Sequence, residues 1–194
     1  MFATYFKPSL IIATLLILMG CSTIPADLNI NSKQPLETGT YQFSNPHAWQ
    51  INSQDYRIAR HLIEIVDGDN VAQLINERQS LRVLVENNLK QAWITNKLKT
   101  ANVSDYKVDI RLIKALTTVT EGAVSYNAST QMIIKVQLTY QDKSFVKLFR
   151  SNNQWEAPFS TNVSRIREEL NKQLSQLLNQ IIKDQELNDK LQKF

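Results

Sequence analysis

Cys21 is the only cysteine of this 194-residue chain, and it follows an apolar run and a glycine in the stretch LLILMGCS, Leu15–Ser22. The cysteine thiolate is the strong nucleophile among side chains, so Cys21 is well suited to covalent modification. The small Gly20 would let a peptidase approach the backbone on the N-terminal side of Cys21. These residue types and this spacing favour cleavage between Gly20 and Cys21.

The apolar run Leu10–Met19 is ten residues long and follows a short segment that carries one cation, Lys7. A helix needs roughly 20 apolar residues to cross a bilayer. A ten-residue run behind a basic start is typical of a signal peptide instead, so we expect residues 1–20 to be removed. The alternative is an ordinary cleaved signal peptide that happens to precede a buried cysteine.

The order Leu18-Met19-Gly20-Cys21 resembles the lipobox of bacterial lipoproteins. The resemblance implies a diacylglyceryl group on the Cys21 sulfur, cleavage before Cys21 and acylation of the new amine. Two acyl chains already anchor a protein stably to a membrane. In such proteins an aspartate after the cysteine tends to retain the protein in the inner membrane, so Ser22 favours the outer membrane, with the protein facing the periplasm.

The charge and residue inventory excludes several classes of function. Loss of Lys7 with the signal peptide lowers the net charge from +4 to +3, and no more than two cations are adjacent, which argues against nucleic-acid binding. Two histidines, His47 and His61, and no second cysteine leave too few ligands for a zinc site of the Cys/His type. The glycines are too scattered for a phosphate-binding or dinucleotide-binding loop. We therefore expect no metal and no cofactor, and the sequence identifies no small-molecule substrate.

A catalytic site is not indicated by the remaining polar residues. A Ser-His-Asp triad cannot be excluded by counting, but no G-x-S-x-G motif is present. His61 is expected within an alternating strand, where a structural role is the simpler interpretation. Glu168 and Glu169 are expected on the solvated face of a helix. We predict that the protein is not an enzyme, and a hydrolase that uses His61 is kept as the least favoured alternative.

The chain divides into three segments. Residues 1–20 are the expected signal peptide, residues 21–45 the lipidated N-terminus and tether, and residues 46–194 a single periplasmic domain. The tether is rich in Ser, Thr, Asn and Pro, with room for one strand at Ala26–Asn31.

The first half of the domain reads as strands followed by a helix. Strands are predicted at His47–Ile51, Arg60–Val66 and Val71–Ile75. A turn at Asp67–Asn70 joins the last two, because Gly68 accepts the positive φ of a hairpin turn. A cation site at Asp67 and Asp69 is the alternative, but two acids are too few for calcium. The three- and four-residue spacing of apolar residues in Ser80–Lys99 predicts an amphipathic helix with Ser80 as its N-cap and Trp93 in the core.

Alternating apolar and polar residues predict three further strands, at Tyr106–Leu112, Ile134–Tyr140 and Ser144–Arg150. The segment Thr120–Thr130 either extends these strands or forms a long loop. A second helix is expected over Thr161–Lys183, with its apolar stripe on the sheet rather than on a membrane or a partner. The polar residues after it are expected to form a solvated extension. The predicted fold is α+β, a two-layer sandwich of a mainly antiparallel sheet with two amphipathic helices on one face.

Several of these segments together are similar to the YajG-type bacterial outer-membrane lipoproteins. The similarity rests on the lipobox, the segment SLRVLVENNLKQ, the segment GAVSYNASTQMIIKVQLTY (Gly122–Tyr140) and the closing helix from Asn162. It covers about Leu81–Ile182 and is loose in the tether. The resemblance implies an α+β periplasmic domain with no assigned catalytic residue, so Cys21 alone carries over, as a modification site.

We therefore expect a lipoprotein on the periplasmic face of the outer membrane that acts as a non-enzymatic interaction or structural module. Its expected partners are the membrane, through the lipid on Cys21, and an unidentified protein of the cell envelope. The alternative is an accessory role in lipid or lipopolysaccharide handling, because a mild cationic excess suits anionic head groups.

Overall fold

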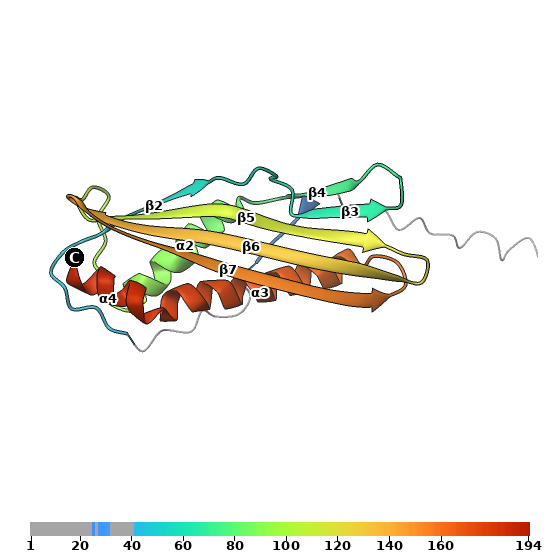
Figure 1. Cartoon of the computed structure of the whole chain (residues 1–194). Coiled ribbons are helices and arrows are strands. Elements are labelled where there is room, and N and C mark those ends of the chain that lie inside the picture. Colours follow the sequence, from blue (N-terminus) through green and yellow to red (C-terminus); the bar gives the residue numbers. More distant parts are fainter. Residues whose placement is uncertain (1–24, 26, 32–40) are drawn as a thin grey trace, which may run out of the picture.

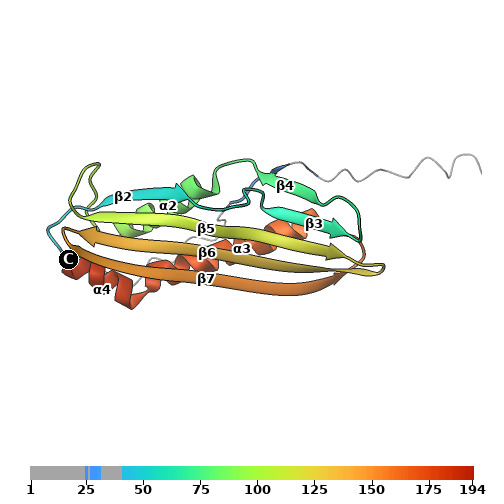
Figure 2. The ribbon, with the colours of Figure 1, turned by 45° about the horizontal axis from the view of Figure 1, so that its top comes forward.

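Three long antiparallel strands form the centre of a mixed sheet, and helices cover one of its faces (Figures 1 and 2). The computed structural model describes residues 25, 27–31 and 41–194. Over these residues the strands are β1 (Asp27–Leu28), β2 (Gln50–Asp55), β3 (Ile63–Asp67), β4 (Gln73–Glu77), β5 (Lys107–Glu121), β6 (Ser125–Tyr140) and β7 (Lys143–Pro158), and the helices are α2 (Leu81–Thr95), α3 (Val163–Lys183) and α4 (Gln185–Lys193). The predicted α+β fold is confirmed.

Strand β5 organises the sheet because two strands share one of its edges. Strand β2 pairs with the first part of β5, and β3 pairs with its last part, both in parallel. The two short strands therefore lie end to end. On the other edge, β5 pairs with β6 and β6 with β7, both antiparallel. The sheet order is β1-β4-β3-β5-β6-β7, with β2 beside β5.

The long strands form where the sequence alternates between apolar and polar residues, and the alternation extends further than expected. In β6 every second residue from Tyr126 to Leu138 is buried. Of the two possibilities for 120–130, the extended strands are correct: β5 runs to Glu121 and β6 begins at Ser125 after a tight turn. One face of the sheet packs on the helices and the other is open.

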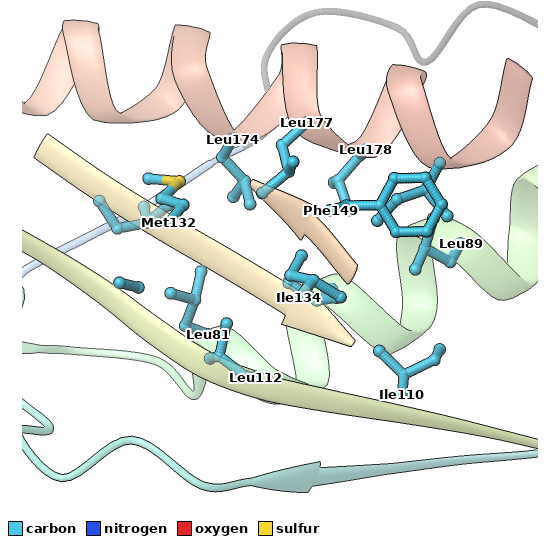
Figure 3. Packing of buried hydrophobic residues seen from close by; sticks show 14 of the residues in the cluster. Leu81, Leu89, Ile110, Leu112, Met132, Ile134, Phe149, Leu174, Leu177 and Leu178 are labelled. Atoms are coloured by element: carbon cyan, nitrogen blue, oxygen red, sulfur yellow. The ribbon is translucent and has the colours of Figure 1, made fainter. Parts of the chain in front are cut away.

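Helix α3 supplies much of the cover. The Asn162 side chain caps its first turn by accepting a hydrogen bond from the Arg165 amide at 3.1 Å. The stripe expected to pack on the sheet is buried, which confirms that interpretation. Figure 3 shows Leu174 and Leu178 reaching toward the side chains of the sheet, where Phe149 is buried.

Helix α2 covers the part of the sheet near β2. The Ser80 hydroxyl accepts a hydrogen bond from the Val83 amide at 3.4 Å, so the predicted N-cap is confirmed. Trp93 is fully buried, as expected of a core residue. The helix ends at Thr95, four residues earlier than predicted, and Lys97 follows with a positive φ of 69°.

The solvated extension expected after α3 was a wrong prediction, because these residues form a third helix, α4. Leu187 and Leu191, four residues apart, are fully buried, and the remaining residues of α4 are mostly polar. Asp184 ends α3 and caps α4, with its carboxylate accepting from the Leu187 amide at 2.8 Å. Lys147 of β7 contacts Asp184 and Glu186, which holds α4 against the sheet.

The strands before α2 differ from the prediction mainly at their ends. His47 lies outside any strand, since β2 begins at Gln50, and His61 lies two residues before β3. The predicted hairpin between β3 and β4 is confirmed, and Gly68 has a φ of +51° in its turn. The Asn70 amide donates to the Asp67 carbonyl at 3.0 Å, so the two acids of this segment belong to a turn.

The strand expected within 26–31 is present as β1, which pairs in parallel with β4. Leu28, within β1, and Ile30, two residues after it, are buried, and so is Phe43 further along the chain. These side chains join the core of the domain. The start of the described chain is therefore fixed to the edge of the sheet formed by β4.

A buried ion cluster lies where β2 ends and the chain crosses toward β3. The side chain of Arg57 is 1% exposed and contacts Asp55 at 2.8 Å and Glu77 at 2.7 Å. Glu77 also accepts a hydrogen bond from the Leu81 amide at the start of α2. Through Glu77, Arg57 thus links the segment between β2 and β3 to the start of α2.

Among the helices of the described chain, none combines the length and the apolar character that a membrane crossing requires.

Candidate functional site

Gly20, Cys21 and Ser22, the residues predicted to direct cleavage, lipidation and sorting, lie outside the described residues. Their roles stay predictions.

The two histidines have different surroundings in the described chain. The His47 ring stacks on Tyr106 at 4.5 Å, and Tyr106 stacks in turn on Tyr140 at 3.9 Å. The buried Nε2 atom of His61 has no hydrogen-bond partner among the described residues. No group of three or more His, Cys, Asp or Glu residues within the described ranges is placed to hold a metal ion.

A cleft of about 810 Å³ opens between the start of α3, the ends of β6 and β7, and the segment that contains β1. Three parts of the chain that are far apart in the sequence therefore meet here. Its lining residues are Pro25, Asp27, Leu28, Asn29, Arg78, Tyr126 and the run Ala157–Arg165 together with Arg167. We call it the α3 cleft.

The α3 cleft is rich in hydrogen-bond donors that the described chain leaves free. Asn162 satisfies the Arg165 amide, but the amides of Val163 and Ser164 have no acceptor within the described ranges. Such amides carry the partial positive charge of a helix N-terminus. The beginning of α3 therefore presents two backbone donors to the cleft.

Two hydroxyl groups add to these donors. Tyr126 is 1% exposed, and its hydroxyl has no hydrogen-bond partner among the described residues. The buried hydroxyl of Thr161 lacks a described partner as well. A buried hydroxyl without a partner is costly, so each of these two groups would gain from a hydrogen bond to a molecule bound in the cleft.

The charged groups of the α3 cleft are mostly cations. Arg165 and Arg167 form no ion pair with a carboxylate of the described chain, whereas Arg78 contacts Asp27 at 2.7 Å. The hydrogen bond from Arg78 holds the pKa of the Asp27 carboxyl below its usual value. The nearby Glu121 accepts a hydrogen bond from the Thr161 amide at 3.1 Å. The arrangement suits an anion, which the free donors and the two unpaired arginines would share.

Exposed apolar side chains surround the same end of the molecule. Phe159, in the wall of the cleft, is 80% exposed, Val124 in the β5–β6 turn is 79% exposed and Val71 in the β3–β4 turn is 94% exposed. The amide of Phe159 donates to the Val124 carbonyl at 2.9 Å. Figures 1 and 2 show these turns gathered at one end of the sheet. We call Val71, Val124 and Phe159 the tip residues.

A second surface is the open face of the sheet. Arg111 of β5 lies opposite Lys135 of β6, and in the next row Lys114 and Arg150 flank Ile133. No carboxylate of the described chain forms an ion pair with any of these four cations, although Lys114 contacts the Gln131 side chain. We call Arg111, Lys114, Lys135 and Arg150 the basic face.

Sequence reasoning did not identify either surface. The α3 cleft joins Asp27, Tyr126 and Arg165, and nothing in their spacing indicates that they meet. One signal was present: the first turn of α3 contains no acidic residue, although acids are favoured there, and it contains Arg165.

The comparisons with known proteins identify a lipoprotein family. Residues 36–192 match the model of a family described as an uncharacterized lipoprotein. The chain belongs to this family, the YajG-type lipoproteins. A comparison with curated proteins finds no match. The predicted family is therefore confirmed, with most of the chain inside the match.

This YajG-type lipoprotein is similar to several solved structures. Protein XCC0632 from Xanthomonas campestris is 12% identical, with a TM-score of 0.51 over 86% of this chain and 97% of that chain. A minor lipoprotein from Acinetobacter baumannii is 10% identical, with a TM-score of 0.39 over 75% and 95% of the two chains. Rare lipoprotein B from Shewanella oneidensis is 14% identical, with a TM-score of 0.33 over 62% and 89%. The first of these likenesses supports a shared fold.

Proposed function

We propose that this lipoprotein is anchored through Cys21 to the periplasmic face of the outer membrane and acts there as a non-enzymatic interaction module. Membership of a lipoprotein family and the lipobox support the anchor. Ser22 after the cysteine favours the outer membrane by resemblance.

The observation that carries the interaction role is the basic face. Like charges directly opposite each other in a sheet destabilise it, and Arg111 lies opposite Lys135. Lys114 and Arg150 extend the positive charge into the adjacent row, and Leu148, in the row of Lys135, is 43% exposed. A sheet face that combines cations lacking a carboxylate partner in the described chain with exposed apolar residues suits an acidic partner.

The partner is a protein rather than a small molecule. The basic face is the broad outer surface of three strands, and small ligands bind in concave sites. An acidic protein surface would offset the repulsion between Arg111 and Lys135 on binding. The partner's approach would be steered by charge, so the association rate should fall as the ionic strength rises.

The anchor is tested with Cys21→Ser in the full chain. The parent chain should incorporate labelled palmitate and fractionate with the outer membrane, and the variant should do neither. Ser22→Asp provides the sorting control, since it should leave lipidation intact and move the protein to the inner membrane. Palmitate-free parent protein would overturn the anchor.

The partner is tested with a photo-crosslinking residue placed at Leu148 in the full chain in living cells. We expect one reproducible cross-linked protein with an acidic surface, lost when Arg111→Gln and Lys135→Gln are combined. The matched controls are a crosslinker at Val83 on α2, which is 39% exposed, and the substitution Lys172→Gln on α3. Equal cross-linking from Val83, or no effect of the two charge changes, would contradict the proposal.

Lipid or lipopolysaccharide handling is the second candidate function, and the α3 cleft favours it. Its free donors and arginines suit a phosphorylated lipid. The direct test is transfer of labelled phospholipid between donor and acceptor vesicles by the purified full chain. A transfer rate equal to the rate without protein would argue against this function.

A further inference from the structure

We propose that the α3 cleft binds the phosphate group of an anionic phospholipid in the same leaflet that holds the Cys21 anchor, while the tip residues enter the lipid. The domain would then have a second, non-covalent contact with its membrane that sets its orientation. The inference rests on the proposed anchoring for the position of the cleft, and it does not require a partner on the basic face.

The donors of the cleft match a phosphate group. The free amides of Val163 and Ser164 resemble the helix N-termini that bind phosphate in other proteins. The buried hydroxyl of Tyr126 is an independent sign of a ligand, because it lies in the cleft wall without a partner among the described residues. A phosphate oxygen would accept hydrogen bonds from groups of both kinds.

The arginines near the start of α3 also favour an anion in the cleft. A cation in the first turn of a helix is unfavourable, since it faces the positive end of the helix dipole. Helix α3 nevertheless carries Arg165 in its first turn and Arg167 two residues later, and its first turn holds no acid to offset them. An anion in the cleft would pair with both guanidinium groups and with the dipole.

The tip residues indicate that the anion belongs to a lipid. Phe159 lies in the cleft wall and is bonded through its amide to Val124, so an apolar side chain lies directly beside the donors. Exposed apolar residues around a cationic site are typical of surfaces that bind anionic membranes. A free phosphate ion would gain nothing from Phe159 or Val124.

The length of the N-terminal segment places the cleft near the bilayer. Asp27, in the cleft wall, is six residues after Cys21, and β1 fixes it to the sheet. Six extended residues span at most about 22 Å. A lipid on Cys21 would therefore keep the cleft within that distance of the head groups, which makes their phosphates the most concentrated anions within reach.

The experiment measures whether the tip contacts lipid in the full lipidated chain. It is reconstituted in vesicles of phosphatidylcholine with or without phosphatidylglycerol. Because Cys21 would carry the lipid, a cysteine introduced by Val124→Cys can be labelled alone with a polarity-sensitive fluorophore. The matched control is Val103→Cys, which is 86% exposed in the loop between α2 and β5 at the opposite end of the sheet.

We expect phosphatidylglycerol to shift the emission of the label at position 124 toward that of an apolar environment and to leave the label at 103 unchanged. Each arginine near an anionic surface contributes about fivefold to the contact equilibrium, so Arg165→Gln combined with Arg167→Gln should reduce it about 25-fold. Arg60→Gln, an exposed arginine outside the cleft, should have no effect. A label at Val71→Cys repeats the measurement further from the cleft.

Three results would overturn the proposal. One is an equal shift of the labels at 124 and 103, and another is a shift that needs no phosphatidylglycerol. In the third, inorganic phosphate shifts the nuclear magnetic resonance signals of the Val163 and Ser164 amides, but phosphatidylglycerol does not change the emission of the label. The cleft would then be a site for free phosphate. The intact mass of the chain measures lipidation separately. The label measures contact of the tip with lipid whether or not Cys21 is the anchor, so the anchor proposal and the cleft proposal can be refuted independently.

Discussion

Phe159 and Val124 are joined by a 2.9 Å hydrogen bond from the amide of the first to the carbonyl of the second, and both side chains remain exposed. This bond fixes the β7–α3 loop to the β5–β6 turn. Phe159 has a φ of 68°, in the left-handed region that a bulky residue rarely adopts. The chain therefore accepts a backbone cost at a position where the aromatic ring gains nothing from burial in the domain.

Replacing Phe159 by glycine should stabilise the domain. The left-handed conformation costs a non-glycine residue roughly 1–2 kcal/mol, and glycine adds an entropic cost of roughly 0.5–1 kcal/mol. We expect the free energy of unfolding in urea to rise by about 0.5–1 kcal/mol. Phe159→Ala is the control, because it removes the ring but keeps the strained conformation. A stability equal to that of Phe159→Ala would contradict this account.

Replacing Arg57 by methionine should destabilise the domain strongly. The change leaves Asp55 and Glu77 without the buried cation that they share, and breaking such a cluster costs about 3–5 kcal/mol. Lys193→Met removes an exposed contact of 3.9 Å with Asp189 and should cost less than about 1 kcal/mol. Chemical unfolding of both variants measures the difference, and similar losses would refute the cluster's role.

The same cluster predicts part of the acid sensitivity. The hydrogen bond from Arg57 lowers the pKa of the Asp55 carboxyl below its ordinary value of 3.8. The stabilisation of the fold by the ionised Asp55 carboxylate is therefore fully present above pH 3.8. It is lost as the pH falls through the lower pKa that Asp55 has in the folded state. In Arg57→Met the dependence of unfolding free energy on pH should be flatter in this acid range. An unchanged slope would mean that other carboxyl groups set it.

Helix α4 should contribute to the core despite its polar sequence. Leu187→Ala removes a fully buried side chain and should reduce the free energy of unfolding by about 2–5 kcal/mol. Gln185→Ala, at an exposed position of the same helix, should change it by less than about 0.5 kcal/mol. Unfolding curves in urea give both values. A small effect of Leu187→Ala would show that α4 is dispensable.

Tyr106, which stacks on Tyr140 at the other end of the sheet, should titrate late. A hydrogen bond to Tyr140 raises the pKa of Tyr106 to about 12, with burial as a smaller cause. A raised tyrosine pKa stabilises the fold below pH 10 and loses that contribution as the pH rises through about 12. The ultraviolet absorbance of tyrosinate should show a step near pH 12 that Tyr106→Phe removes. A titration of Tyr106→Phe that matches the parent would contradict the assignment.

The elements of this fold were predictable where one short pattern determines them. The alternation of apolar and polar residues predicts β6, the apolar stripe predicts α3, and Gly68 predicts the hairpin turn. Each of these elements depends on residues that are close together in the sequence. The parallel pairing of β2 and β3 along one edge of β5 was not predictable, since it depends on contacts more than 50 residues apart. Helix α4 was missed because two leucines suffice to bury its short apolar face.

The α3 cleft could not have been assembled from the sequence for the same reason. Tyr126 and Val163 belong to different elements, and only the pairing of β6 with β7 brings the start of α3 beside the tyrosine. Arg165 in an acid-free first turn was the available clue. It identifies an unusual helix start, whereas the free hydroxyl of Tyr126 becomes visible only in three dimensions.

The length of the central strands would determine how far from the membrane a partner binds. Strands β6 and β7 each contain 16 residues, and at about 3.3 Å per residue they extend roughly 50 Å. With the tip residues at the bilayer, the stacked rings of Tyr106 and Tyr140 would stand about that far out in the periplasm. The sheet would then be a rigid spacer, and the basic face along its middle would meet its partner at a fixed height above the membrane.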